Sequence, residues 1–117
     1  MKYLLLVHID RQIIGALTPA EDKAQIRESL DYDRELIDKG HLIAAHALAE
    51  PEAATIIRNR NGRVSMTDGP YVETKEHVGG FMLIEAKDLN EAVAVAAKAP
   101  VARFGAIEVR PIVELEP

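Results

Sequence analysis

One segment concentrates the side chains that could do chemistry: residues 68–80, which read Asp-Gly-Pro-Tyr-Val-Glu-Thr-Lys-Glu-His-Val-Gly-Gly. It places five titratable residues within ten positions, namely Asp68, Glu73, Lys75, Glu76 and His77. Gly69-Pro70 and Gly79-Gly80 mark points where the backbone turns or is approached closely. Longer ordered connections between strands tend to carry function. The simpler interpretation is a solvated, charged loop with glycines near both ends.

General acid–base catalysis is the reaction type that these residues support best. It needs one group held near neutrality by burial or by a like-charged neighbour, and a second group that stabilises developing charge. We therefore predict three catalytic candidates: Asp68, His46 and Asp33. The predicted ligand-binding residues are His8, Tyr71, Glu73, Lys75 and His77, with Lys75 or Arg110 as the cation.

Each of these residues also has a structural explanation. Aspartate before Gly-Pro caps turns by accepting hydrogen bonds from backbone amides, which is sufficient to explain Asp68. Lys75 stands between two glutamates and could form only local ion pairs, which contribute little in water. Asp33 lies in the middle of an apolar helix face formed by Ile26, Ser29, Leu30, Leu36 and Ile37. A carboxylate there is costly unless it is paired or neutralised, or unless the helix clears the core at that point.

The four histidines do not form a recognisable metal site. His41 and His46 have odd spacing on one expected strand, so they point to opposite faces. A three-ligand set of His8, His46 and a carboxylate is the alternative, but each histidine is explained more simply as a polar surface or strand-end residue, and we predict no metal. His46 stands out because its face otherwise reads Leu42, Ala44 and Leu48.

Several function classes are excluded or disfavoured. The chain has no cysteine, which excludes disulfides and thiol catalysis. It has no Gly-x-Ser-x-Gly, Walker A or dinucleotide motif, so we predict no cofactor. A net charge of −5 argues against nucleic acid as a partner. The apolar run Leu4–Val7 is too short for a signal peptide or a membrane span, so a cytoplasmic protein is expected.

The pattern of apolar residues, caps and turns predicts a single domain over residues 1–117. The expected strands are 2–8, 41–49, 54–59, 63–67, 81–84 and 106–113, with Asn61-Gly62 closing a hairpin. The expected helices are 19–39, from Thr18 as N-cap to Gly40 as the left-handed stop, and 89–99, from Asp88 as N-cap to Pro100. We expect a loop over residues 9–17, and an apolar face of Leu89, Ala92, Val93, Ala96 and Ala97 on the second helix.

This order of elements predicts an α+β fold, a ferredoxin-like sandwich with an inserted β-hairpin. Residues 2–8 and 81–84 are apolar on both faces, so both faces of the sheet need cover. Two helices can cover only one face. We therefore expect a homodimer that packs sheet against sheet, as a dimeric α/β barrel.

The nine residues from Asp68 to Glu76, Asp-Gly-Pro-Tyr-Val-Glu-Thr-Lys-Glu, resemble the signature of the DGPF (DGPFAETKE) family of YCII-related proteins. Tyr71 replaces the usual Phe, and Val72 replaces Ala. Supporting matches are Met1–Leu6, Gly79–Ile84 and Val109–Ile112. The resemblance implies a ferredoxin-like subunit, usually dimeric, with a small-molecule or enzymatic role. Some members are associated with extracytoplasmic-function sigma factors.

The resemblance also implies two limits on mechanism. A helix histidine paired with an aspartate has been proposed as a catalytic dyad in the wider group, but residues 27–33 of this chain contain no histidine. The hydroxyl of Tyr71 is absent from the family's usual Phe, so it is not essential to a shared mechanism.

Three functional hypotheses follow. The first is a small-molecule-binding protein or acid–base enzyme with a pocket beside residues 68–80. The alternative is a regulatory or interaction module associated with an extracytoplasmic-function sigma factor. The third is that the loop only locks the dimer.

Overall fold

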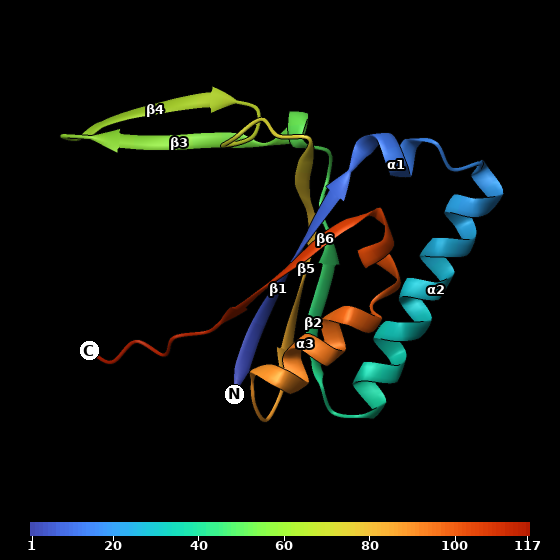
Figure 1. Ribbon diagram of the computed structural model, residues 1–117. Coiled ribbons are helices and arrows are strands. Elements are labelled where there is room, and N and C mark those ends of the chain that lie inside the picture. The colour runs from blue at the N-terminus through green and yellow to red at the C-terminus, as the bar shows by residue number, and fades with distance from the viewer.

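The computed structural model describes residues 1–117. A four-stranded antiparallel sheet has the order β2-β5-β1-β6, and the hairpin β3–β4 stands apart from it (Figure 1). The strands are β1 Lys2–Asp10, β2 Leu42–Ala47, β3 Thr55–Arg60, β4 Arg63–Asp68, β5 Glu76–Glu85 and β6 Gly105–Pro111. The helices are α1 Arg11–Gly15, α2 Pro19–Asp38 and α3 Leu89–Lys98, with the 3-10 turns η1 Pro51–Ala53 and η2 Pro100–Phe104.

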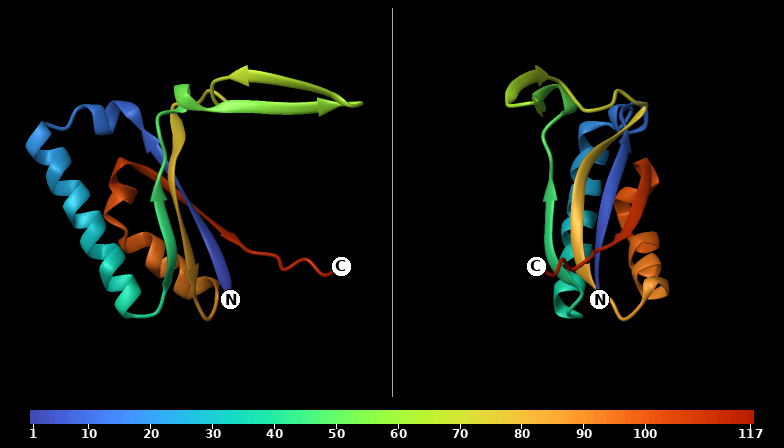
Figure 2. Two further views of the ribbon diagram at one scale, coloured as in Figure 1. Left: turned by 180° about the vertical axis from the view of Figure 1, so that it is seen from behind. Right: turned by 90° about the vertical axis from the view of Figure 1, so that its left-hand side faces the viewer.

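The helices α2 and α3 cover one face of the sheet, and no helix covers the other (Figure 2). The central strand β1 alternates between these faces. Its buried side chains Tyr3, Leu5, Val7 and Ile9 face the helices, whereas Leu4, Leu6 and His8 are only half-buried on the uncovered face. The α+β class and the two-faced character of this strand are therefore confirmed. None of the helices is both long and apolar enough to cross a membrane.

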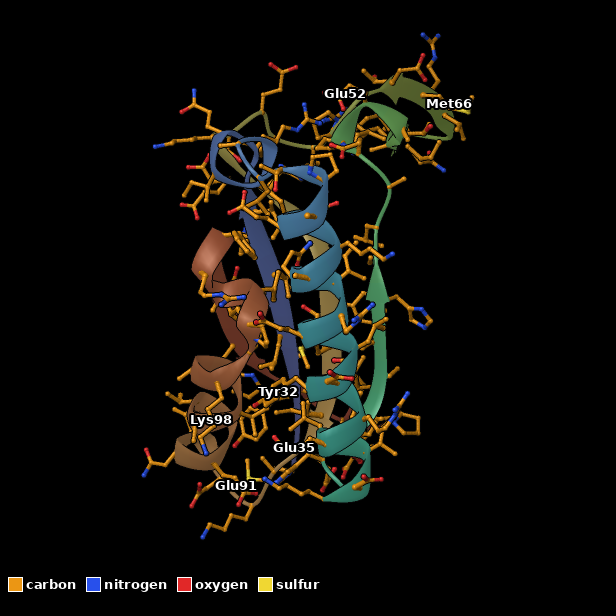
Figure 3. The ribbon with its side chains drawn as sticks, turned by 90° about the vertical axis from the view of Figure 1, so that its right-hand side faces the viewer. Tyr32, Glu35, Glu52, Met66, Glu91 and Lys98 are labelled. Atoms are coloured by element: carbon orange, nitrogen blue, oxygen red, sulfur yellow. The ribbon has the colours of Figure 1, made fainter.

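The caps of helix α2 follow the sequence closely. Thr18 and Glu21 form a reciprocal capping box, and Gly40 has a φ of +76° just after the helix ends. The predicted apolar face was wrong in part, because Ile26, Leu30 and Ile37 are exposed. The helix is rotated so that Tyr32 and Leu36 point inward, and the Tyr32 hydroxyl donates to the Val95 carbonyl at 2.7 Å (Figure 3).

Helix α3 is also rotated about its axis relative to the orientation predicted from the sequence. Asp88 accepts a hydrogen bond from the Glu91 amide as the predicted N-cap, at 2.9 Å. The buried residues are Ala92, Val95 and Ala96, while Leu89 and Val93 are exposed. Alanine side chains allow this helix to approach the sheet closely, and its last turn directs the larger Val95 into the core.

The segment 9–17 was expected to be a loop, and this was wrong. Strand β1 continues to Asp10, whose carboxylate accepts from the Gln12 amide at 2.9 Å and caps the short helix α1. The chain therefore has three α-helices rather than two. A helix of only five residues is too short to produce a recognisable apolar repeat.

Strand β5 is also longer than expected, so Gly79 and Gly80 lie inside it. A Cβ on Gly79 would lie 2.8 Å from Ile9 Cγ1, and a Cβ on Gly80 would lie 2.9 Å from the His46 carbonyl oxygen. These glycines do not turn the chain. They permit the neighbouring strands β1 and β2 to pack closely against β5.

The hairpin β3–β4 forms as predicted, with both turn residues in the left-handed region: Asn61 has a φ of 55° and Gly62 a φ of +82°. This geometry matches the twist of a two-residue hairpin. The hairpin extends away from the sheet (Figures 1 and 2), and every residue of β4 is exposed.

Candidate ligand-binding site

A hollow of about 470 Å³, here called the loop pocket, lies beside the connection between β4 and β5. Five parts of the chain form it: the start of α1, the turn η1, the end of β4, the loop over residues 69–75 and the start of β5. Its polar side chains are Arg11, Glu52, Asp68, Glu73, Thr74 and His77. Three of the residues predicted from sequence, Asp68, Glu73 and His77, therefore share one cavity.

Arg11 supplies the positive charge of this pocket. Its guanidinium donates to both oxygens of Glu52, at 2.6 and 2.5 Å, and lies 3.0 Å from Glu50. These hydrogen bonds from Arg11 lower the pKa of Glu52 to about 2, and His77 contributes in the same direction. Arg11 and Glu52 were missed by the sequence analysis, because residues 41 positions apart leave no local pattern.

We predict that Arg11→Ala returns the pKa of Glu52 from about 2 toward its ordinary value of 4.5. The folded-state pKa is depressed, so the ion pair stabilises the fold above pH 4.5, and this stabilisation is lost as the pH falls through about 2. Both side chains are well exposed, so the effect on overall stability is small. A carboxyl-detected NMR titration of Glu52 measures the shift. An unchanged pKa in the variant contradicts the assignment.

Lys75 lies outside the loop pocket and forms an ion pair that connects the loop to the end of strand β1. Its ammonium group is 3.5 Å from a carboxylate oxygen of Asp10, which is only 5% exposed. No ion pair joins Lys75 to Glu73 or Glu76, as had been considered from the sequence. The same Asp10 caps α1, so one buried carboxylate positions both the helix and the end of the loop.

A second hollow of about 570 Å³, here called the face pocket, opens on the uncovered face of the sheet. Its walls are largely apolar, with Leu48, Pro70 and Val78 among them, and it includes the predicted residues His8 and Tyr71. His77 borders both hollows. His8 Nε2 lies 3.0 Å from Glu108, and the Arg58 guanidinium lies 5.7 Å from the centre of the Tyr71 ring.

The other two catalytic candidates lie elsewhere. A groove of about 350 Å³ between α2 and the sheet, here called the helix groove, is bordered by Asp33 and His46. Burial raises the pKa of Asp33, and the nearby Ser29 hydroxyl is buried without a hydrogen-bond partner. The His46 ring packs near Phe81, with 5.7 Å between ring centres. Asp68 therefore does not share a cavity with Asp33 and His46.

The structure contains no group of three or more histidine, aspartate or glutamate side chains that could hold a metal ion. The chemistry available in the loop pocket is that of carboxylates, one guanidinium and one imidazole. These groups bind polar atoms and transfer protons.

Comparisons with known proteins match the whole chain. The family model of the YCII-related domain matches residues 1–116. An uncharacterised protein of Rhizobium meliloti (strain 1021), R00369, is 32% identical over 119 residues, which cover 100% of this chain and 96% of that protein.

Among solved structures, the chain is similar in fold to 5-chloro-2-hydroxyhydroquinone dehydrochlorinase from Burkholderia phenoliruptrix AC1100, determined in complex with 2,5-dihydroxybenzoquinone. The TM-score is 0.52 and the identity 16%, over 97% of this chain and 94% of the other. At this identity the likeness concerns the fold, and it is consistent with the ferredoxin-like architecture predicted from the sequence.

Proposed function

The chain belongs to the YCII-related family, and from that premise we propose that it binds a small molecule in the loop pocket and acts there by acid–base chemistry. One observation carries the proposal. Asp68, Glu73 and His77, all from the segment 68–80, line a single cavity together with Arg11, and His77 also borders the apolar face pocket. Binding sites for small molecules combine apolar walls with a few convergent polar groups in this way.

We assign a different role to each of these residues. Histidine exchanges protons near neutral pH, so His77 is the proposed general acid–base group at the boundary between the polar and apolar hollows. Asp68 accepts a hydrogen bond from the ligand, and Arg11 fixes the wall of the pocket through its contacts with Glu52 and Glu50. Arg11 is held in place by two glutamates, so its position does not depend on the ligand.

A small ring that carries hydroxyl or oxo groups fits this arrangement. Its apolar face would contact the walls of the face pocket, and its oxygens would reach His77 and Asp68. The solved structure of similar fold was determined with 2,5-dihydroxybenzoquinone, which makes hydroxylated quinones the first ligands to test. The segment 68–76 supports the finer assignment to the DGPF group.

We predict that Asp68→Asn and His77→Gln each weaken the binding of 2,5-dihydroxybenzoquinone by roughly tenfold, because each removes one charged or proton-transferring partner. Isothermal titration calorimetry measures the affinity. Asp31→Asn is the matched control, since Asp31 is an exposed aspartate of α2 that lines none of the three hollows.

Unchanged affinity in both variants contradicts the loop pocket as the binding site. Asp33→Asn and His46→Gln test the helix groove in the same assay. If only these two substitutions weaken binding, the ligand binds in the helix groove, and the proposed roles of Asp68 and His77 are wrong.

We also propose a homodimer that buries the uncovered face of the sheet. Leu4, Leu6, Phe81 and Leu83 lie on this face and are only half-buried in one chain. Covering such a face with a second copy produces the dimeric α/β barrel expected from the sequence. A sample that remains monomeric by light scattering at micromolar concentration contradicts the proposal.

A regulatory role with a sigma factor is the second candidate function. The exposed side chains Ile26, Leu30 and Ile37 along α2 favour it, because contiguous exposed apolar residues mark interaction surfaces. Ile37→Asp and Leu30→Asp would then abolish co-purification with an extracytoplasmic-function sigma factor. Absence of any such complex with the parent protein contradicts this role.

A further inference from the structure

The hairpin β3–β4, residues 55–68, forms an arm that lacks a partner. It is a separate two-stranded sheet and extends away from the body (Figures 1 and 2). An isolated two-stranded hairpin is at best marginally stable in water, and its outer edges present unpaired backbone groups. A hairpin of this kind gains stability when a further strand pairs with one edge.

The two faces of the arm differ sharply. The strand register places Ile57, Val64 and Met66 on one face, and the Met66 side chain is 71% exposed. The opposite face carries Arg58, Arg60 and Arg63. Arg60 and Arg63 are directly opposite each other, which is unfavourable for like charges, and none of the three arginines forms an ion pair. The arm therefore lacks both an apolar cover and an acidic partner.

The C-terminal segment has the complementary pattern. Residues 112–117 read Ile-Val-Glu-Leu-Glu-Pro and run beyond β6 without secondary structure. Residues 113–117 form no backbone hydrogen bonds, and Leu115 is 90% exposed. In an extended conformation Val113 and Leu115 point to one side, and Glu114 and Glu116 to the other.

As an added strand, this segment matches both faces of the arm at once. Its apolar side chains would continue the face of Ile57, Val64 and Met66, and its glutamates would reach the arginine face. The lengths agree too. The segment and each strand of the arm have six residues, and six residues in strand conformation span about 20 Å.

The arm and the C-terminal segment of one chain cannot meet. The Ile112 amide bonds to Lys2 at the start of β1, whereas the arm joins the sheet near Asp10 at the end of β1. Nine residues of strand separate them, about 30 Å. Both nevertheless project on the uncovered side of the sheet (Figure 2). A two-fold axis across the strands would place the arm of one copy beside the C-terminal segment of the other.

We infer that the C-terminal segment of a second copy, residues 112–117, adds a strand to the arm, with the exchange occurring twice in a two-fold dimer. The inference rests on the proposed homodimer. The added strand is the binding partner of the arm. This exchange also fixes the orientation of the two subunits, whose β1 strands run antiparallel to each other across the interface.

Cross-linking tests the contact directly, because the chain has no cysteine of its own. Met66→Cys in one copy and Leu115→Cys in a second, tagged copy are co-expressed and treated with a short bismaleimide. The expected main product is the tagged–untagged pair, confirmed by mass spectrometry. Lys98→Cys, on α3 at the other side of the sheet (Figure 3), replaces Met66→Cys in the control and should give no cross-link.

Charge reversal tests the energetics. Glu114→Lys with Glu116→Lys, and separately Arg60→Glu with Arg63→Glu, are each expected to raise the dimer dissociation constant roughly tenfold. All four substitutions together should restore it. Sedimentation equilibrium measures these constants. If the dimer dissociation constant is unchanged in every variant and no cross-link forms, the inference is wrong but the proposed homodimer is not contradicted. A monomer in the unmodified protein overturns the dimer and the inference together.

Discussion

Replacement of Gly105 by alanine is expected to lower the free energy of unfolding by about 3 kcal/mol or more. A Cβ at this position would lie 1.9 Å from the His8 carbonyl oxygen and 3.1 Å from Ile9 Cα. Both are backbone atoms of β1, which pairs with β6 at this point, so neither can rotate away. The strand must move and break hydrogen bonds of the sheet. The φ of Gly105 is 168°, outside the left-handed region, so the expected cost comes from the steric overlap of the added Cβ.

Urea denaturation measures this loss, with Gly15→Ala as the matched control. Nothing lies within 4 Å of a Cβ on Gly15, which ends helix α1, so that substitution should be neutral or slightly stabilising. If Gly105→Ala stays within about 0.5 kcal/mol of the parent protein, the close approach of β6 to β1 is wrong.

Leu5→Ala is the second substitution with a large expected effect, a loss of about 2–5 kcal/mol. Leu5 is 0% exposed and lies in the core cluster formed with Leu36, Ile84 and Val95. Truncation of its isobutyl side chain to a methyl group leaves a cavity that the surrounding strands cannot close, because both neighbours of β1 hold it in register. The loss should be the same at every protein concentration.

The neighbouring residue Leu6 provides the informative comparison. It lies on the uncovered face and is half-buried in a single chain. If a second copy covers this face, Leu6→Ala weakens the association of the two copies. The melting temperature of the Leu6→Ala variant should then approach that of the parent protein at low protein concentration and fall below it at high concentration. An effect of Leu6→Ala that is independent of concentration contradicts the proposed interface. A Leu5→Ala loss below about 1 kcal/mol contradicts the core.

The proposed site depends on contacts between distant parts of the chain. The pair Arg11–Glu52 joins the start of α1 to η1, and the pair Asp10–Lys75 joins the end of β1 to the loop. Together they surround the segment that carries Asp68, Glu73 and His77. Substitution of either pair is therefore a way to alter the pocket without touching its proposed acid–base group.

The sequence alone determined the parts of the structure that follow local rules. The capping box of Thr18 and Glu21, the N-cap Asp88 and the left-handed turn at Asn61-Gly62 each depend on residues within four positions. The strand predicted over residues 2–8 was likewise visible from a local run of residues that is apolar on both faces, although the structure extends it to Asp10. The segment 68–80 was found because its titratable residues are close in sequence.

The tertiary structure alone decided how those parts meet. It brought Arg11 to Glu52, rotated α2 so that Tyr32 rather than Ile26 faces inward, and placed Gly79-Gly80 inside a strand. It also separated Asp68 from Asp33 and His46 into different hollows. The physical reason is that helix rotation and long-range ion pairs depend on how all the elements pack together, and no window of neighbouring residues contains that information.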